Sequence, residues 1–356
     1  MPVGLATRPV VGGQPRHMAV DPPLPDVFTT ATALRAGLSR HAVAHRLHAG
    51  RWRRLRRGVY CRTVLWESLD SRGRHLLCAR AELLVPVPER VLSHASAAAA
   101  WGLPLPAAGL RQLWTTDGDL RRTARRTEDR VLEVASLRPQ DVVRLDGLPA
   151  TAEARTVADC LRHLALPDAV AIGDAALHGR LTTLDQLDEV LRFQTSWPLI
   201  TRARAARPLL DGRRESPLES ESFVSLWQCG IPLPFAQVYV YDADGRFVGV
   251  VDGLWISAGL VGECDGRTKY DLDLIGRRDP DAARAALLRE KVREDRLRAT
   301  QLGVVRWGTW DVRHDLAGLA RRVRAALATG DLRRFTGSLR TSRSPSDVID
   351  LRPYLR

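Results

Sequence analysis

The alternation of apolar and polar positions divides the chain into three patterned segments. Residues 26–62 contain two short helical patterns on either side of Gly37, followed by an extended basic stretch. From residue 71 to 193, helical patterns alternate with strand-like ones, and residues 216–307 follow the order helix, three strands, helix, strand. We therefore predict an α/β protein (α+β overall) with more than one domain, for which 356 residues are sufficient.

The periodicities also give bounds for the expected elements. The middle segment has helical patterns at 74–84, 93–101, 152–164, 167–177 and 184–191, and strand-like ones at 112–116 and 130–135. The C-terminal segment has a helix from 216 to a stop at Gly230, strands at 236–241, 247–255 and 260–264, a helix at 282–301 and a strand at 304–307. We expect a disordered leader (1–25), a winged helix-turn-helix (26–65), a mixed α/β middle region (66–196), a linker (197–215), a C-terminal α/β domain (216–335) and a loosely held tail (336–356).

The first ordered segment has the pattern of a DNA-binding helix-turn-helix. Phe28 and Leu34 are expected on the first helix, Gly37 ends it, and Ser39 is a suitable N-cap for the second. The second helix of such a motif enters the major groove, and basic residues in the following wing meet phosphates. We expect DNA contacts from Arg40, His41, His45 and Arg46 on the helix and from Arg51, Arg53, Arg54, Arg56 and Arg57 in the wing. An arginine-rich hairpin that is only a solvated interaction surface is the alternative.

Charge and cysteine content narrow the class of protein. The net charge is +13 and the isoelectric point is near 10.5, which favours a polyanionic partner such as DNA, although a solvated basic surface would give the same values. Five widely spaced cysteines without a C-x-x-C pair predict reduced thiols in a cytoplasmic protein. The apolar stretches are interrupted by Gly and Pro, so we expect no membrane partner.

Acidic residues on the expected C-terminal strands suggest a metal site. Strand alternation places Asp252 with Val248, Val250 and Leu254 on one face, and Glu263 with Val261 and Asp265 on one face of the next strand. Carboxylates that converge in this way repel one another unless a cation neutralises them, and oxygen ligands favour Mg²⁺ or Mn²⁺. We expect Asp252 and Glu263 as metal ligands, with Glu219 as a third from the preceding helix. A favourable charge at the helix N-terminus is the alternative role for Glu219.

Lysine usage singles out one further residue. Of the 54 basic residues only Lys269 and Lys291 are lysines, and the other 52 are arginines. A compact ammonium group beside a carboxylate-bound metal can orient a water in a way that a guanidinium cannot. We expect Lys269 to position the nucleophile, so that Asp252, Glu263, Asp265, Lys269 and Glu219 form the candidate catalytic set.

The N-terminal pattern resembles the winged-helix module of AbiEi-type antitoxin proteins. The residues that carry the likeness are Leu34, Gly37, Gly50, Trp52, Leu55, Gly58, Val59 and Tyr60. Ser93 to Ala98 and Arg155 to Asp159 resemble phrases of the region that follows this module. The resemblance implies a DNA-binding regulator and leaves a toxin protein as a second partner open. Within the middle region, we expect His94 to be a capping or core residue, and Arg155 and Asp159 to form a helix-surface ion pair.

Residues 216–335 resemble Vsr-like (very-short-patch-repair-like) endonuclease domains of the PD-(D/E)XK, restriction-endonuclease-like type. The likeness rests on Ser216 to Ser220, Gly230 to Gln237, Val251-Asp252, Glu263 to Gly266, Arg293 to Arg296 and Gly303 to Trp307. It implies Mg²⁺- or Mn²⁺-dependent hydrolysis of DNA phosphodiesters. The sequence departs from the pattern at Val251, which replaces proline, and at Asp265, which replaces lysine, while Lys269 takes the place of a histidine. A regulator with an inactive nuclease-like domain and a nuclease acting on RNA are the alternatives.

Overall fold

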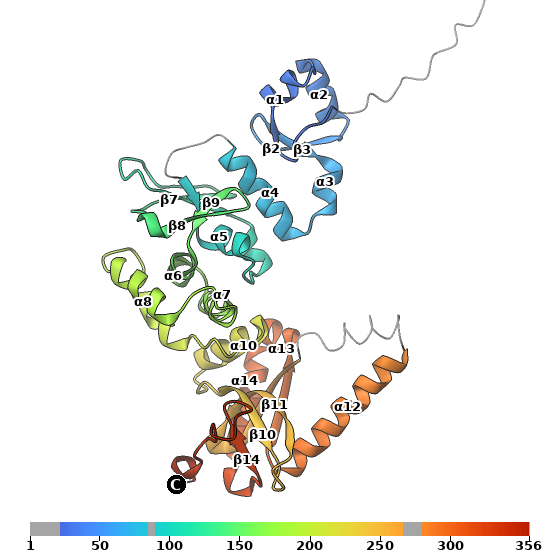
Figure 1. Cartoon of the computed structure of the whole chain (residues 1–356), viewed down its shortest axis with the longest axis vertical. Helices are drawn as coiled ribbons and strands as arrows, with labels where there is room; N and C mark the ends of the chain where they lie inside the picture. The colour runs from blue at the N-terminus through green and yellow to red at the C-terminus, as the bar shows by residue number, and fades with distance from the viewer. Residues whose placement is uncertain (1–21, 85–89, 266–279, 356) are drawn as a thin grey trace, which may run out of the picture.

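The computed structural model describes residues 22–84, 90–265 and 280–355. A winged helix-turn-helix lies at one end of the long axis, a helix-rich middle region follows, and a C-terminal sheet lies at the other end (Figure 1). Helices and strands are mixed, and the described strands form sheets of three, six and five members. The predicted α/β fold class is therefore confirmed.

The N-terminal segment is winged-helix-like. It comprises β1 (Phe28–Thr29), α1 (Thr30–Arg35), α2 (Arg40–His48), β2 (Trp52–Arg56) and β3 (Val59–Arg62), with the strand order β1-β3-β2. The left-handed φ of +88° at Gly37 turns the chain between the helices, and Ser39 Oγ accepts the amide hydrogen of Ala42 at 3.1 Å as the N-cap. We expected Phe28 on the first helix, but it lies in β1. Its ring packs in the apolar cluster between the helices and the wing, and the strand places it there.

Aromatic packing holds the wing against the helices. Phe28 and Trp52 are buried with their ring centroids 4.6 Å apart in an edge-to-face arrangement, and Tyr60 joins the same cluster. Val59 and Cys61 on the other side of β3 pack with the next helix of the chain. The wing is therefore fixed to the middle region and is not an independent arm.

The middle region surrounds a six-stranded sheet with the order β6-β7-β5-β4-β9-β8 among the described strands. The expected helices and strands are present. Four short strands were not predicted, because two to four residues are too few to show alternation. The elements are α3 (Thr63–Ser68), α4 (Ser71–Leu83), β4 (Arg90–Leu92), α5 (His94–Trp101), β5 (Leu113–Asp117), β6 (Arg125–Arg126), β7 (Arg130–Val134), β8 (Val142–Leu145), β9 (Leu148–Thr151), α6 (Glu153–His163), α7 (Leu166–His178) and α8 (Leu184–Phe193).

The segment 197–215 is part of a folded core, which corrects the expectation of a linker. It contains α9 (Ile200–Ala206), whose Ile200 and Ala203 are buried in one cluster with apolar residues of α6, α7 and α8. Asp174 of α7 accepts hydrogen bonds from the Asp211 amide and from Arg214 Nη1, both at 2.7 Å. The small apolar residues of α9 are enough to bury one face of this helix. The arginines between them give the segment 197–215 the composition of a linker.

The C-terminal domain has its sheet between two layers. Its elements are α10 (Pro217–Gln228), β10 (Phe235–Tyr241), β11 (Phe247–Trp255), β12 (Leu260–Asp265), α12 (Pro280–Ala299), β13 (Gly303–Gly308), α13 (Thr309–His314), α14 (Leu316–Thr329) and β14 (Ser338–Arg340). The described strands have the order β13-β12-β11-β10-β14, with β12 and β13 parallel and the other pairs antiparallel. Phe223 and Trp307 pack with α13 and α14 on one face, and Leu254 and Leu297 pack together on the other.

The expected tail supplies an edge strand to this sheet. Within β14, Arg340 pairs with Tyr239 of β10, and Leu339 is completely buried. Ile349 and Leu351 pack against the same apolar cluster. The expectation of a loosely held segment at 336–356 is corrected, because a three-residue strand in a Ser- and Arg-rich context has no local signal of its own.

Strand alternation is interrupted beside the expected metal ligand. Gln237 and Asp252 lie between the paired residues Ala236–Gly253 and Val238–Val251, and Gln237 has a left-handed φ of +54°. As a result Val251 and Leu254, three residues apart, belong to one apolar cluster. The assignment of Val248, Val250, Asp252 and Leu254 to one regular face is therefore wrong. In the described part of the chain no helix has the length and apolar character needed to cross a membrane.

Candidate nucleic-acid interface and carboxylate site

The winged helix presents part of the expected DNA-binding set to solvent. Arg40, His41 and His45 are exposed on α2, and Arg51, Arg54 and Arg57 are exposed in and beside the wing hairpin. Six side chains with basic groups therefore lie on the second helix and the wing of one small module. The residue His48 at the end of α2 is also exposed and was not predicted.

Arg46 does not lie on the exposed side of α2. Its side chain is buried, with 6% of its surface accessible, and its guanidinium stands over the Trp52 ring at 5.6 Å. Nη1 donates to the carbonyl oxygen of Ala42 at 3.3 Å. The expected DNA contact of Arg46 is corrected, because the i to i+4 geometry of the helix turns this side chain toward the wing core.

Two wing arginines contact protein groups on the side of the hairpin that faces the middle region. Arg53 places its guanidinium 4.4 Å from the centroid of the Trp66 ring, although it remains exposed. Arg56 donates from Nη1 to the carbonyl oxygen of Glu82 at 3.0 Å and lies 3.1 Å from a carboxylate oxygen of the same residue. Both anchor the wing to the middle region, which leaves Arg51, Arg54 and Arg57 as the wing residues most open to a phosphate.

The expected metal ligands come from three neighbouring elements. Glu219 lies in the first turn of α10, Asp252 on β11 and Glu263 on β12. Gly253 pairs with Gly262, so Asp252 and Glu263 are the next residues in the same register, and Asp252 Oδ2 accepts the Cys264 amide at 2.7 Å. The strand register that the sequence suggested for these two carboxylates is therefore present.

The Asp252 carboxyl is electrostatically strained. Burial, with a smaller contribution from the carboxylates of Glu219 and Glu263, raises the pKa of Asp252 to about 7, against the lowering effects of the Cys264 amide and of Arg293. Within the described residues, Oδ2 alone of its two oxygens accepts a hydrogen bond. A buried carboxyl with a pKa near neutrality beside two others is the arrangement that a cation would relieve.

Glu263 already has cationic partners. It is 5% exposed, and Arg293 of α12 donates from Nη2 to Oε2 at 2.6 Å and from Nη1 to Oε1 at 3.2 Å. Arg306 of β13 lies 3.5 Å from Oε2. Both arginines belong to phrases that carry the resemblance, but neither was predicted to contact Glu263. A bidentate guanidinium therefore occupies both oxygens that a metal would use.

The hydrogen bonds of Glu219 fit its alternative role at the helix N-terminus, and its role as a metal ligand stays a prediction. Its Oε2 accepts the Glu215 amide at 3.0 Å, as a residue at a helix N-terminus does, and also Gln237 Nε2 at 2.9 Å. The left-handed backbone at Gln237 thus brings an amide side chain to the carboxylate site. Strained backbone in a non-glycine residue is frequent at functional sites.

Of the two remaining candidates, Asp265 alone belongs to the described residues. Asp265 is exposed at the end of β12, and its side chain makes no hydrogen bond or ion pair with a described residue. Lys269 lies outside the described residues. No group of three or more His, Cys, Asp or Glu side chains in the described ranges is arranged to hold a metal ion. The all-oxygen set of Asp252, Glu219 and Glu263 fits Mg²⁺ or Mn²⁺ in its chemistry, and Glu263 would have to release Arg293 to join it.

Sequence reasoning also missed a buried polar network in the middle region. Asp159 is fully buried and accepts from Arg155 Nε at 2.8 Å, Arg162 Nη2 at 2.8 Å and Gln194 Nε2 at 3.0 Å. The expected surface ion pair between Arg155 and Asp159 is therefore corrected. The guanidiniums hold the pKa of Asp159 well below its usual range, against the raising effect of burial.

His94 is a core residue, as expected. It is fully buried, stacks near Trp114 with ring centroids 4.5 Å apart, and its Nε2 is 3.1 Å from Nδ1 of His163. Desolvation lowers the pKa of His94 to about 3, so the imidazole is neutral at physiological pH. A neutral imidazole without access to solvent has a structural role, and His94 therefore packs in the core.

Comparison with known proteins gives two relatives and one family match. Two uncharacterized proteins of Mycobacterium tuberculosis, one from strain CDC 1551 / Oshkosh and one from strain ATCC 25618 / H37Rv, are each 30% identical over 180 residues. The aligned part is 51% of this chain and 62% of each relative, so the match spans less than two thirds of the relatives' length. Residues 24–63, which form the winged helix, match the family described as "Transcriptional regulator, AbiEi antitoxin", as the sequence led us to expect.

Proposed function

We propose that the protein is a DNA-binding regulator of the antitoxin type, with the winged helix as its duplex-binding module. The observation that carries the proposal is the exposure of basic side chains on α2 and the wing within the segment that matches the AbiEi antitoxin regulators. A helix and a wing of this kind can contact bases in the major groove and phosphates beside it. The same match supports a toxin protein as a further partner, and the five free cysteines suit a reducing cytoplasm.

Duplex binding by the purified full chain tests the proposal. We expect a fluorescent duplex of random sequence to bind with an affinity that falls steeply with salt, since arginine contacts release counterions from the phosphates. The double variant Arg54→Ala/Arg57→Ala should weaken this binding and lower the slope of log affinity against log salt by about 2. Binding that is indifferent to both salt and these substitutions would refute the winged-helix interface.

Arg46 and Arg192 provide matched controls. Arg192 is exposed on α8, outside the winged helix, and Arg192→Ala should leave duplex binding unchanged. Arg46→Ala removes a buried guanidinium and should lower the stability of the winged helix without lowering the salt slope, because this side chain contacts Trp52 and Ala42. A salt slope reduced in Arg46→Ala would mean that this residue reaches phosphate after all.

A second candidate function is metal-dependent cleavage of phosphodiesters at the carboxylate site. The specific support is the raised pKa of Asp252, which follows from its burial beside the carboxylates of Glu219 and Glu263. These three residues would hold the Mg²⁺ or Mn²⁺ ion. When bound, such a cation can activate a water and neutralise charge on a scissile phosphate. Gln237 orients the Glu219 carboxylate, and the Cys264 amide orients that of Asp252.

A nicking assay on supercoiled DNA tests this second function. With Mn²⁺ or Mg²⁺ the wild-type chain should convert supercoiled to open circular plasmid, and Asp252→Asn and Glu263→Gln should abolish the conversion. Asp350→Asn, which changes an exposed carboxylate outside the carboxylate site, is the matched control. Equal nicking by wild type and Asp252→Asn would remove the carboxylate site from the chemistry, and no nicking by the wild type would favour the regulator with an inactive nuclease-like domain. Single-stranded RNA in place of plasmid tests the RNA alternative.

A further inference from the structure

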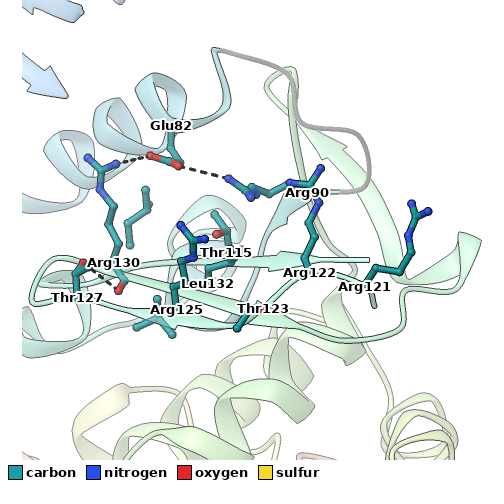
Figure 2. A pocket seen from close by; sticks show the side chains of 12 residues that line it. Glu82, Arg90, Thr115, Arg121, Arg122, Thr123, Arg125, Thr127, Arg130 and Leu132 are labelled. Atoms are coloured by element: carbon teal, nitrogen blue, oxygen red, sulfur yellow. Dashed lines mark hydrogen bonds and ion pairs between the residues drawn. The ribbon is translucent and has the colours of Figure 1, made fainter. Parts of the chain in front are cut away.

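A second concentration of arginines lies in the middle region, outside both sites described above. A pocket of about 540 Å³ opens on the six-stranded sheet between the end of α4 and the turn that joins β5 to β6 (Figure 2). Five of its lining residues are arginines and one is an acid, Glu82. The arginines are Arg90, Arg121, Arg122, Arg125 and Arg130. We call this site the arginine pocket.

Buried and half-buried acids hold most of these guanidiniums in place. Asp117, which is fully buried below the pocket, contacts Arg90 Nη2 at 3.1 Å and Arg122 Nε at 3.5 Å. Glu82 contacts Arg130 Nη1 at 2.7 Å and Arg90 Nη1 at 3.8 Å (Figure 2). Asp119 also accepts Arg121 Nε at 2.8 Å, and Asp129 lies 3.2 Å from Arg130 Nε. Acids therefore pair with four of the five arginines and fix the orientation of their guanidiniums, and Arg125 is the exception.

Arg125 differs from the other arginines of the pocket. It lies on the edge strand β6, its side chain is exposed, and that side chain makes no ion pair or hydrogen bond with a described residue. Substitution of Arg125 should change the free energy of unfolding little, because it leaves no buried acid without a partner. Arg125 is also the guanidinium of the pocket most available to an incoming anion.

The chemistry of the lining selects phosphate among anions. Guanidiniums present planar pairs of N–H donors that match phosphate oxygens, and several around one hollow favour a dianion or successive phosphodiesters over a single carboxylate. The hydroxyl groups of Thr115 and Thr123 on the sheet side of the pocket add neutral hydrogen-bonding groups. The volume is larger than one phosphate group, so the ligand extends beyond it.

The arginine pocket is continuous with the wing. Glu82 forms ion pairs with Arg130 and Arg90 of the pocket and with Arg56 of β2 in the wing hairpin. One carboxylate therefore lies at the junction of the two basic surfaces, and the exposed Arg57 follows directly in the hairpin turn. A polyanion that lies across the wing has the pocket as its neighbouring contact.

We propose that the arginine pocket binds phosphate groups, and that the backbone of a duplex held by the winged helix supplies them. The proposal rests on the proposed DNA-binding function. The backbone on one side of the winged-helix site passes over Glu82 into the pocket, where Arg125 and Arg122 contact its phosphates. The interface then spans two domains, and the wing anchored through Arg56 sets their relative position.

The experiment compares Arg125→Glu with Arg192→Glu in the full chain. In one arm, affinity for a random-sequence duplex is measured over a range of salt. In the other, binding of ATP and of pyrophosphate is measured by calorimetry without DNA. We expect Arg125→Glu to weaken duplex binding about fivefold to tenfold and to lower the salt slope by about 1, with no change in Arg192→Glu and no nucleotide binding.

Each outcome decides between the sources of phosphate. Nucleotide or pyrophosphate binding that is lost in Arg125→Glu, with duplex binding unchanged, would keep the phosphate site and overturn the duplex as its source. If Arg125→Glu changes neither duplex binding nor nucleotide binding, the proposed phosphate site is overturned. The proposed DNA-binding function still stands in that case if Arg54→Ala/Arg57→Ala weakens duplex binding. Conversely, duplex binding that depends on Arg125 but not on the wing arginines would sustain the pocket and refute the winged-helix interface.

Discussion

Arg293 holds both carboxylate oxygens of Glu263, with Nη2 2.6 Å from Oε2 and Nη1 3.2 Å from Oε1. The two residues come from α12 and β12, and the acid is almost fully buried. The pair places a protein cation where the proposed metal site needs one of its ligands. A buried carboxylate without a partner is unfavourable, so Glu263 needs a positive charge beside it. Arg293 supplies that charge when no metal ion is bound.

Substitution of Arg293 by methionine should destabilise the C-terminal domain. The methionine keeps much of the aliphatic contact over Gly249, but Glu263 is left with Arg306 at 3.5 Å as its cationic neighbour. We expect a loss of about 3 kcal/mol in the free energy of unfolding, measured by urea denaturation. The double variant Arg293→Met/Glu263→Gln should recover most of it. If Mn²⁺ can replace the guanidinium, excess Mn²⁺ should stabilise Arg293→Met more than wild type; equal stability of all three proteins without metal would contradict the role of the pair.

Removal of the Asp159 carboxylate should cost far more than the loss of a surface ion pair. Asp159→Ala leaves Arg155 and Arg162 buried without their shared acceptor, so the free energy of unfolding should fall by about 3 to 5 kcal/mol. The partly exposed pair of Asp188 and Arg207 is the control, and Asp188→Ala should cost about 1 kcal/mol or less. Similar losses in the two variants would show that the middle-region network is no more than a surface contact.

His94 should make the protein sensitive to acid. Burial lowers the pKa of His94 to about 3, whereas an unfolded histidine has a pKa near 6.5. The unfolded chain therefore takes up a proton below about pH 6.5 that the native chain does not, and stability is lost as the pH falls from about 6.5 toward about 3.

The test is urea denaturation of wild type and His94→Gln at pH about 7 and about 5. Wild type should lose about 2 kcal/mol more than the variant between these two values, since one pKa unit corresponds to about 1.4 kcal/mol. His75, whose pKa burial also lowers, is present in both proteins, so its contribution cancels in the comparison. Parallel losses in the two proteins would assign the acid sensitivity elsewhere.

Truncation after Phe335 should destabilise the C-terminal sheet. The deletion removes β14, exposes the edge of β10 and takes the fully buried Leu339 out of the core. We expect a lower thermal midpoint and concentration-dependent aggregation. In the full chain, Leu339→Ala should cost about 2 to 4 kcal/mol, whereas Leu355→Ala, at an exposed position, serves as the neutral control. A truncated chain that melts like the full chain would show that the strand is dispensable.

The periodicities of the sequence were sufficient wherever the signal is local. The turn at Gly37, the cap at Ser39 and the helical stripes from α4 to α8 depend on neighbours a few residues away, and these elements were predicted close to their observed bounds. The register of Asp252 and Glu263 followed in the same way from the short turn between β11 and β12. Strands of two to four residues and the helix α9 lacked such signals, because composition does not distinguish a packed alanine from an exposed one.

What the sequence by itself determined is the order of the elements, the winged helix and the placing of three carboxylates on neighbouring elements. Only the tertiary structure decided which charges are free to act. Arg46 and Arg54 have the same chemistry, yet one is buried against Trp52 and the other is exposed. Arg293 and Glu263 are thirty residues apart in the chain and meet at 2.6 Å. Burial and charge pairing depend on distance in space, which local propensity does not encode, and so the partners of the charged residues emerged only with the fold.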